Sequence, residues 1–292
     1  MVPVIRKSDY KEGEKGAWIG ILGNLALFVV KILAGVFGRS HAMIADAFHT
    51  ASDALTSLAV FAGFKIAQKP ADREHPFGHG RAESIAAKIV SIILIIAGLK
   101  IVYDSAKVLV SGNIPTPGSI ALLVACLSIL VKEVSYRRVI FLSGKINSSS
   151  LRADAYHHRS DVFSSVAALI GITGARLGWT FMDPLAGIVV AALILKIGFE
   201  SFHAAYDELM DAAPPEELKK KIEDTVGSCE GVKQVKKVMV RKSGIELFLE
   251  VTIGVDGEKT VREGHYVTMK VRRTVFKAMP NVRDILVHVE PV

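Results

Sequence analysis

The sequence has 292 residues, half of them hydrophobic, and its mean hydropathy is +0.37. A soluble globular chain this rich in aliphatic residues is usually less hydrophobic overall, so membrane-spanning segments have to be tested first. The formal net charge is +7, which in a membrane protein is typical of cytoplasmic loops and gives only weak support for nucleic-acid binding. The only two cysteines, Cys126 and Cys229, support neither a disulfide framework nor a thiolate metal cage, because they are far apart and form no C-x-x-C motif.

Six segments approach the length and apolar character of membrane helices, since about 20 predominantly apolar residues cross a bilayer. They are residues 17–37, 42–66, 84–110, 119–141, 151–174 and 184–206. The first, third, fourth and sixth are nearly continuous apolar runs, whereas aspartates and histidines interrupt the second and fifth. The sequence therefore predicts a six-helix transmembrane domain over residues 1–211.

The distribution of lysine and arginine predicts that both termini lie in the cytoplasm, because short cytoplasmic connections are enriched in these residues. The N-terminal arm and the second-to-third and fourth-to-fifth connections together contain Arg6, Lys7, Lys11, Lys15, Lys65, Lys69, Arg73, Arg81, Lys132, Arg137, Arg138, Lys145 and Arg152. The opposite side has little more than Arg39, Lys107 and Arg176. We therefore expect a multi-pass protein of the cell membrane with cytoplasmic N- and C-termini.

The sequence becomes charged and amphipathic after residue 206, and the run Ala-Ala-Pro-Pro at 212–215 closes the last span. Hydrophobic periodicity predicts helices at 216–226 and 261–279 and strands at 235–241, 246–255 and 282–289. This helix-strand-strand-helix-strand order favours an antiparallel or mixed sheet with helices on one face. The sequence thus predicts a C-terminal α+β domain over residues 212–292, small enough that dimerisation would help it to fold.

An internal repeat gives the strongest chemical signal. The residues ADAFHTASD of the second segment recur as ADAYHHRSD in the fifth. Positions i and i+4 share one face of a helix, so His49 stacks with Asp53. The same spacing stacks His157 with Asp161. Two such helices facing each other would supply two imidazoles and two carboxylates, a ligand set suited to tetrahedral Zn²⁺.

The alternative for these four residues is that they are buried polar groups that hydrogen-bond within the helix bundle. Ionisable residues at membrane depth are costly and normally face a cavity or a pathway, so two matched pairs favour a metal pathway. Asp46 and Asp154 stand three residues before the two histidines. They could orient the imidazoles as outer-shell carboxylates or be acids near a helix start, and the second role is slightly favoured.

A second group of metal-ligand residue types lies between the second and third segments. The sequence DREHPFGHG, with one proline and two glycines, predicts a tight turn that brings His75 near His79, with Asp72 alongside. Two histidines and a carboxylate would suit an open zinc site. The alternative is a solvated loop in which the histidines have no specific role.

A third group lies in the C-terminal domain. His288 and Glu290 alternate on one face of the last predicted strand. His265 comes from the second predicted helix and joins them only if the fold brings it there. These three residues are equally well explained as solvated surface residues.

Together, these motifs closely resemble the cation diffusion facilitator (CDF) family over nearly the whole chain. The resemblance rests on the two His-x-x-x-Asp pairs, the Asp-x-x-His-x-x-x-His-Gly-[RK]-Ala-Glu block and the small C-terminal domain. It implies a homodimeric, proton-coupled exporter of divalent metal ions in the lipid bilayer, with six spans and a ferredoxin- or metallochaperone-like C-terminal domain. The transport site it implies is His49, Asp53, His157 and Asp161, and the loop site is Asp72, His75 and His79.

The resemblance also implies a salt-bridge hinge between the foot of the third span and the end of the sixth, where Arg81 and Asp211 stand. Family members with a two-metal C-terminal site have two further histidines on the strands of that domain. The corresponding positions here are Lys236 and Thr252. A weaker single-metal site at His265, His288 and Glu290 is then the most that the resemblance implies.

The expected substrate is Zn²⁺, because two imidazoles with two carboxylates favour it, although Cd²⁺, Co²⁺ or Fe²⁺ would also be accepted. Mn²⁺ prefers a more oxygen-rich set, to which Asp46 or Asp154 could contribute. Neutral histidine and ionised aspartate bind the metal, so loading releases protons. Metal ions at the loop or C-terminal sites would regulate transport only by binding one conformation more tightly.

Two alternatives to a zinc exporter remain open from the sequence. One is an exporter of the same class that selects Mn²⁺ or Fe²⁺, and another is a membrane metal receptor that binds ions without moving them. An enzyme is not expected, because the sequence offers no nucleophile motif, phosphate loop or His-Glu-x-x-His element. We also expect no organic cofactor and no nucleic-acid partner.

Overall fold

The computed structural model describes residues 7–67, 69, 71–146, 149–244 and 246–292. Within the helices it describes the backbone but not the side chains of residues 7–21, 56–57, 59–65, 67, 139, 142–146 and 149–160. The chain forms two compact units. One consists of Met1–Ala59 and Ile89–Ser201, and the other of Val60–Lys88 and Phe202–Val292.

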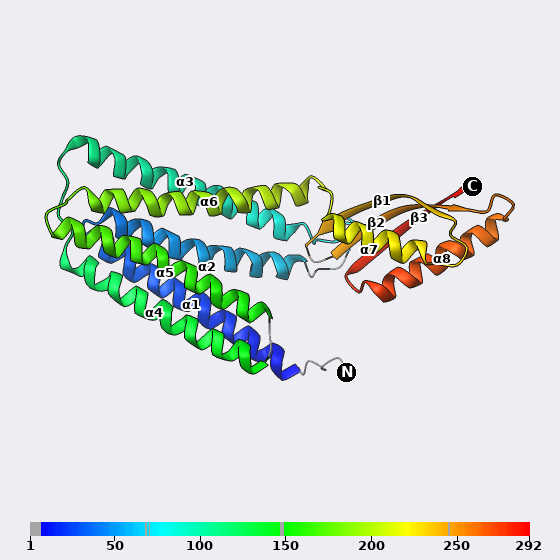
Figure 1. Ribbon diagram of the computed structural model, residues 1–292, viewed down its shortest axis with the longest axis horizontal. Coiled ribbons are helices and arrows are strands. Elements are labelled where there is room, and N and C mark those ends of the chain that lie inside the picture. The colour runs from blue at the N-terminus through cyan, green and yellow to red at the C-terminus, as the bar shows by residue number, and fades with distance from the viewer. Residues whose placement is uncertain (1–6, 68, 70, 147–148, 245) are drawn as a thin grey trace. The chain divides into compact units, whose positions relative to one another are not determined.

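Six long helices precede the C-terminal part, one for each predicted span (Figure 1). They are α1 Lys7–Phe37, α2 His41–Ala67, α3 Ala82–Ser111, α4 Ser119–Ile146, α5 Ser149–Arg176 and α6 Met182–Leu209. Among the described residues, α3, α6 and the Ser119–Arg138 part of α4 are long and apolar enough to cross a membrane. The polar residues that interrupt α2 and α5 are those of the internal repeat, and they are explained by the site described below.

The structure corrects the placement of the basic residues assigned to the fourth-to-fifth connection. Arg137, Arg138 and Lys145 lie within α4 and Arg152 lies within α5. Lys132 also lies within α4, but it differs from the exposed Arg137 and Arg138 in being buried. The residue is only 3% exposed, so it lies inside the helical unit. The reason is that a basic residue near the end of an apolar run can be buried by neighbouring helices, which a count of charges in loops does not detect.

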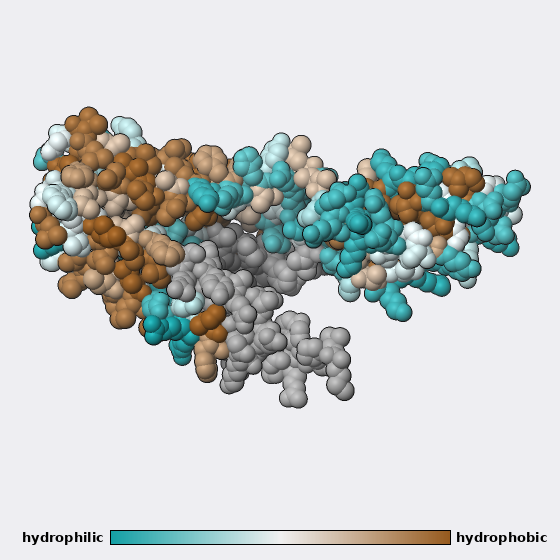
Figure 2. Space-filling model, in the orientation of Figure 1, coloured by the Kyte–Doolittle hydropathy of each residue, from teal (hydrophilic) through white to brown (hydrophobic). Residues whose placement is uncertain are grey.

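The outer surface of the helical unit is apolar. Large aliphatic side chains are exposed on α3 and α4, and Figure 2 shows hydrophobic residues gathered over the helices. They include Ile89, Ile93, Ile96, Leu123 and Leu130. An apolar surface of this extent is unfavourable in water and is matched by the hydrocarbon core of a bilayer, so these helices face lipid.

Small residues let the helices approach closely. A Cβ atom built on Gly98 of α3 would come within 2.8 Å of Leu195 Cγ on α6. One built on Gly198 of α6 would come within 2.9 Å of Ile95 Cγ1 on α3. Because membrane helices associate through close packing rather than through the hydrophobic effect, the two glycines fit a tight α3–α6 contact.

The C-terminal part has the predicted order of elements. It consists of α7 Glu216–Gly227, β1 Gln234–Ser243, β2 Glu246–Val255, α8 Val261–Ala278 and β3 Val282–Pro291. Its three strands lie in the order β1-β2-β3, with β1 and β2 antiparallel and β2 and β3 parallel, so the sheet is mixed. Alternate residues of β2, such as Leu249 and Val251, are buried in one core with Ile222 of α7 and Val271 of α8. The α+β prediction is confirmed.

Candidate metal centre

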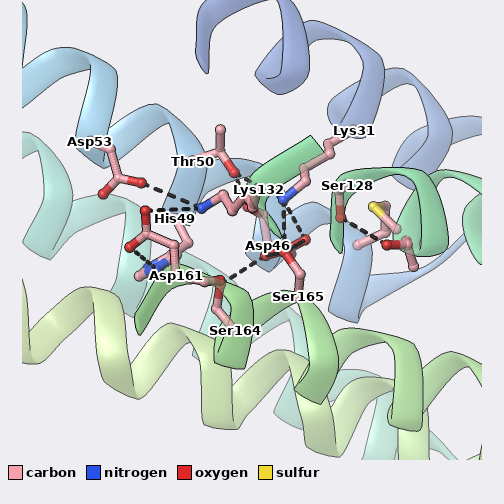
Figure 3. Close-up of polar contacts among 12 residues, drawn as sticks. Lys31, Asp46, His49, Thr50, Asp53, Ser128, Lys132, Asp161, Ser164 and Ser165 are labelled. Carbon is pink, nitrogen blue, oxygen red and sulfur yellow. Dashed lines mark hydrogen bonds and ion pairs between the residues drawn. The ribbon is translucent and has the colours of Figure 1, made fainter. Parts of the chain in front are cut away.

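Three of the candidate ligands converge between α2 and α5 (Figure 3). His49 and Asp53 lie one turn apart on α2, and Asp161 lies on α5. His49 Nε2 is 3.8 Å from Asp161 Oδ1, and one ligand atom from each of the three residues lies within 4.8 Å of the other two. His49 is 5% exposed and Asp161 is 3% exposed, so this group of donors is shielded from solvent.

The remaining predicted member of this set is His157, and neither its side chain nor that of Asp154 is among those that the structure describes. The backbone of α5 is helical throughout Ser149–Arg176. His157 therefore precedes Asp161 by about one helical turn.

Small and hydroxylated residues make this convergence possible. Ala45 and Ala47 are fully buried on α2, which allows neighbouring helices to pack close to its backbone. Ser52 Oγ donates to the carbonyl of His49 at 2.6 Å, so its own polar group is satisfied within the helix. His49 Nδ1 is buried and has no hydrogen-bond partner among the described residues. Since either ring nitrogen can bind a metal, no hydrogen bond within the described part of the chain prevents Nδ1 of this imidazole from acting as a ligand.

A buried lysine, which the sequence reasoning did not connect with the site, lies beside these carboxylates. Lys132 Nζ of α4 is 3.3 Å from Asp161 Oδ2 and 3.7 Å from Asp53 Oδ2. Figure 3 shows its side chain entering between the two carboxylates. One feature of the sequence could have indicated this role. Lys132 directly follows the apolar run that ends in Leu130 and Val131. A charged residue inside such a membrane helix requires a buried partner of opposite charge.

A second buried lysine explains Asp46. Lys31 Nζ of α1 is 2.6 Å from Asp46 Oδ2, and both side chains are fully buried. Ser165 Oγ of α5 donates to Asp46 at 3.0 Å, and Ser164 Oγ donates to the same carboxylate at 3.0 Å. Asp46 therefore ties α1, α2 and α5 together. Its described hydrogen bonds go to these groups rather than to the imidazole of His49.

The loop cluster of Asp72, His75 and His79 also forms. Asp72 Oδ1 is 3.4 Å from His75 Nδ1, Asp72 Oδ2 is 3.5 Å from His79 Nε2, and the two ring centroids are 4.4 Å apart. Gly78 has a φ of 83°, a left-handed conformation that suits glycine and closes the turn. Asp72 and His75 are about half exposed, so this cluster is open to solvent.

The backbone of the loop fixes the charge of Asp72. The amides of His75 and Glu74 donate to Asp72 Oδ1 at 2.6 Å and 3.0 Å. These hydrogen bonds, with that from His75 the largest cause, lower the pKa of the Asp72 carboxyl below its ordinary value. The cluster therefore presents an ionised carboxylate and two imidazoles, a set of nitrogen and oxygen donors that suits a divalent transition metal.

The two residues predicted to form a hinge meet in the structure. Arg81, directly before α3, donates from Nη2 to Oδ1 of Asp211, just after α6. Asp211 has a φ of 55°, which places it in the left-handed turn that ends this helix. One turn earlier, Glu208 accepts from the amide of Gly244 at 2.8 Å and pairs with Lys242 at 3.2 Å. The ends of α3 and α6 and the β1–β2 turn are thus joined by charged contacts.

The third candidate group is not assembled within one chain. His288 Nε2 lies 3.7 Å from Glu290 Oε1 on β3. Within residues 246–292, all of which the structure describes, His265 does not come within 4.8 Å of both. It lines a surface pocket of α8 instead, and Glu290 Oε2 is paired with Lys236 Nζ at 2.7 Å.

Two family models match the chain. The model described as "Cation efflux transmembrane domain" matches residues 17–210. The model described as "Cation efflux protein, cytoplasmic domain" matches residues 214–292. Together the two matches cover nearly the whole sequence.

Curated relatives resemble the chain along most of its length. The "Manganese efflux system protein MneP" of Bacillus subtilis is 35% identical over 284 residues, which cover 95% of each chain. "Metal tolerance protein C1" of Arabidopsis thaliana is also 35% identical, over 96% of this chain and 63% of its own. "Magnetosome protein MamB" of Magnetospira sp. is 33% identical over 94% of each chain. Among solved structures, "MamM-CTD 215-293" is 25% identical and covers 26% of this chain and 98% of its own, with a TM-score of 0.26.

Proposed function

Since the chain belongs to the cation efflux family, the cation diffusion facilitators, we propose that it exports Zn²⁺ from the cytoplasm in exchange for protons. The observation that carries the proposal is the convergence of His49, Asp53 and Asp161 inside a unit whose outer surface is apolar. Ionisable groups are costly in such a place unless they serve a pathway. In this proposal the fourth ligand is His157, from the matched pair on α5.

The choice of Zn²⁺ rests on the chemistry of the donors. Two imidazole nitrogens and two carboxylate oxygens suit a tetrahedral site for Zn²⁺. Cd²⁺, Co²⁺ and Fe²⁺ accept similar ligands, whereas Mn²⁺ favours a more oxygen-rich set. Asp46 would be the nearest further source of oxygen on α2, but Lys31 and two serines already bind its carboxylate. This engagement of Asp46 supports Zn²⁺ over Mn²⁺.

Proton exchange follows from the same ligands. A metal ion binds neutral imidazole and ionised carboxylate, so loading releases protons and reprotonation favours release. The helices would present the site alternately to the two sides of the membrane, as expected for transporters whose sites lie near the bilayer midplane. We propose a homodimer of the cell membrane with cytoplasmic termini, in which Arg81 and Asp211 act as a hinge. Metal bound at the loop cluster would favour one conformation.

A second candidate function is the export of Mn²⁺. The observation that favours it is the resemblance to MneP, which is named as a manganese efflux protein and matches the chain over 95% of both lengths. Both candidates use the same buried centre, so selectivity is the only difference between them. A membrane receptor that binds metal without moving it is the alternative from another class.

The test is uptake of Zn²⁺, Mn²⁺ and Fe²⁺ into vesicles containing the purified protein, with and without a pH gradient. Zinc transport that responds to the gradient and is lost in Asp53→Ala is the expected result. A matched control is Asp104→Ala, which changes an exposed aspartate of α3 whose described partner is Lys100. Flux of Mn²⁺ alone would favour the second candidate. Metal binding without flux under either condition would contradict export and leave the receptor.

A further inference from the structure

The helical unit buries two lysines beside carboxylates, and their surroundings differ. Lys31 Nζ lies 2.6 Å from Asp46 and donates to Thr50 Oγ1 at 3.0 Å and to Ser165 Oγ at 3.1 Å. Three oxygen atoms therefore surround its three N–H donors. This ammonium is held in a complete set of short contacts, so Lys31 is suited to a fixed structural role.

Lys132 is held far less firmly. It is as deeply buried, but its ion pairs with Asp161 and Asp53 measure 3.3 Å and 3.7 Å. Its Nζ atom has no hydrogen bond in the part of the chain that the structure describes. A buried ammonium without hydrogen bonds is costly, and it is retained here by attraction to two carboxylates that are themselves candidate metal ligands.

We propose that Lys132 is a tethered cation of the transport site, one that occupies the carboxylates between transport events and that the incoming metal ion must displace. The proposal rests on the proposed export function and identifies Lys132 as a residue that sets metal affinity and release. It adds no ligand to the site. The candidate metal ligands lie on α2 and α5, and through Lys132 the helix α4 also affects metal binding directly.

The charges explain why the two cations exclude each other. A divalent ion bound by Asp53 and Asp161 is neutralised by their two charges. An ammonium that remained within 4 Å of both carboxylates would repel the ion strongly, because charges interact strongly where water is excluded. The flexible four-carbon stem of lysine lets the ammonium leave without movement of the backbone.

Displacement lowers affinity because Lys132 has no second carboxylate to move to among the described residues of the buried centre. The remaining buried anion nearby, Asp46, is already neutralised by Lys31. Binding of the metal therefore carries the cost of moving an ammonium away from its anions, and release of the metal recovers it. A transport site has to bind its ion weakly enough to let it go, and this competition supplies that weakening.

The test compares Lys132→Met with Lys132→Arg and with the wild-type protein. Methionine keeps a similar length without the charge, whereas arginine keeps the charge. Zn²⁺ affinity is measured on the purified full chain by competition with a coloured chelator, at one pH for all three proteins. Initial rates of Zn²⁺ uptake into vesicles give KM and maximal flux.

We expect Lys132→Met to bind Zn²⁺ roughly five- to a hundredfold more tightly, the usual range of coupling between two linked binding events. Its KM should fall together with its maximal flux, because release becomes slower. Lys132→Arg should keep an affinity close to that of the wild type. If Lys132 had only a structural role, its replacement would not tighten Zn²⁺ binding. A higher affinity together with a lower maximal flux therefore distinguishes a competing cation from a structural residue.

Lys100→Met is the control, since Lys100 is an exposed lysine of α3 that pairs with Asp104 one turn away. It should leave affinity and flux unchanged. If Lys132→Met does not yield folded protein, Lys132→Gln takes its place with the same expectation. Unchanged or weaker Zn²⁺ binding in the folded uncharged variant overturns the proposal. A wild-type protein that neither binds nor transports Zn²⁺ overturns the proposed function instead.

Discussion

The buried centre and the loop cluster use the same donor types in different surroundings. Each brings histidine nitrogen and carboxylate oxygen within 4.8 Å. In the buried centre the donors come from two helices, they are shielded from solvent, and an ammonium lies against the carboxylates. In the loop they come from a single turn, and Asp72 is more than half exposed and tied to its own backbone.

The difference in solvent exposure predicts different roles for the buried centre and the loop cluster, although both have the same donor types. Electrostatic interactions are strong where water is excluded and weak where water screens them. A change of charge in the buried centre should therefore affect transport and stability strongly. The same change in the loop should alter metal binding there with only a modest effect on transport.

The largest difference is expected between Asp161→Ala and Asp72→Ala. Replacing an outer-shell residue of a metal site typically costs about 10- to 100-fold, so loss of the buried ligand should lower Zn²⁺ flux by roughly a hundredfold or more. Loss of the loop carboxylate should lower flux only a few-fold. Vesicle uptake measured on both variants at equal protein density checks this. Equal losses would contradict a division between a transport site and an accessory site.

The next largest effect concerns the buried pair of Lys31 and Asp46. Lys31→Met should lower the free energy of unfolding by about 3–5 kcal/mol, because it leaves a buried carboxylate without its counter-charge. Denaturant unfolding in detergent measures the loss. The double variant Lys31→Met with Asp46→Leu should recover much of it, since no lone charge is then buried. A double variant no more stable than Lys31→Met would show that the serine contacts of Asp46 matter more than the charge pair.

A smaller effect is expected from pH at the loop cluster. The pKa of Asp72 is lowered by backbone hydrogen bonds, so its carboxylate stays ionised further into the acid range than an ordinary aspartate does. Asp72 should therefore remain an ionised metal ligand at a pH where an ordinary aspartate is already protonated, so metal binding at the loop should persist further into the acid range. Zn²⁺ binding to the Asp161→Ala protein, followed from neutral to acid pH, measures this.

Asp72→Asn provides the control for that measurement. It should weaken binding at every pH without moving the midpoint of the pH dependence. A midpoint that moves with this variant would show that Asp72 itself titrates in the range.

The smallest effect is expected at the C-terminal domain. Lys236 lowers the pKa of Glu290 through a hydrogen bond and so holds this carboxylate as an ion pair. Any metal at His288 and Glu290 has to compete with this lysine. Lys236→Met should raise the Zn²⁺ affinity of this site a few-fold. The measurement uses a protein in which Asp161 and His79 are also substituted, so that the other two sites do not contribute. Lys237→Met is the neighbouring control, and equal binding by both variants would exclude this competition.

Much of this molecule could be predicted from local patterns. Segments of about 20 predominantly apolar residues, two of them interrupted by aspartates and histidines, predicted the six long helices, because a bilayer imposes that length on a helix. Alternation and helical periodicity predicted the order of the C-terminal elements. The four-residue spacing placed His49 with Asp53, since i and i+4 share a face wherever a helix forms.

Only the tertiary structure decided which faces meet. Asp161 approaches His49 from another helix, and Asp46 finds Lys31 rather than the neighbouring imidazole. Lys132 has no motif that marks it, and from the sequence it was counted as a loop charge. Spacing along a chain fixes the neighbours within one helix, whereas the partners of a buried charge depend on how several helices pack together. The sequence therefore determined the spans, the paired donors and the family, and packing decided which carboxylates each buried lysine lies against.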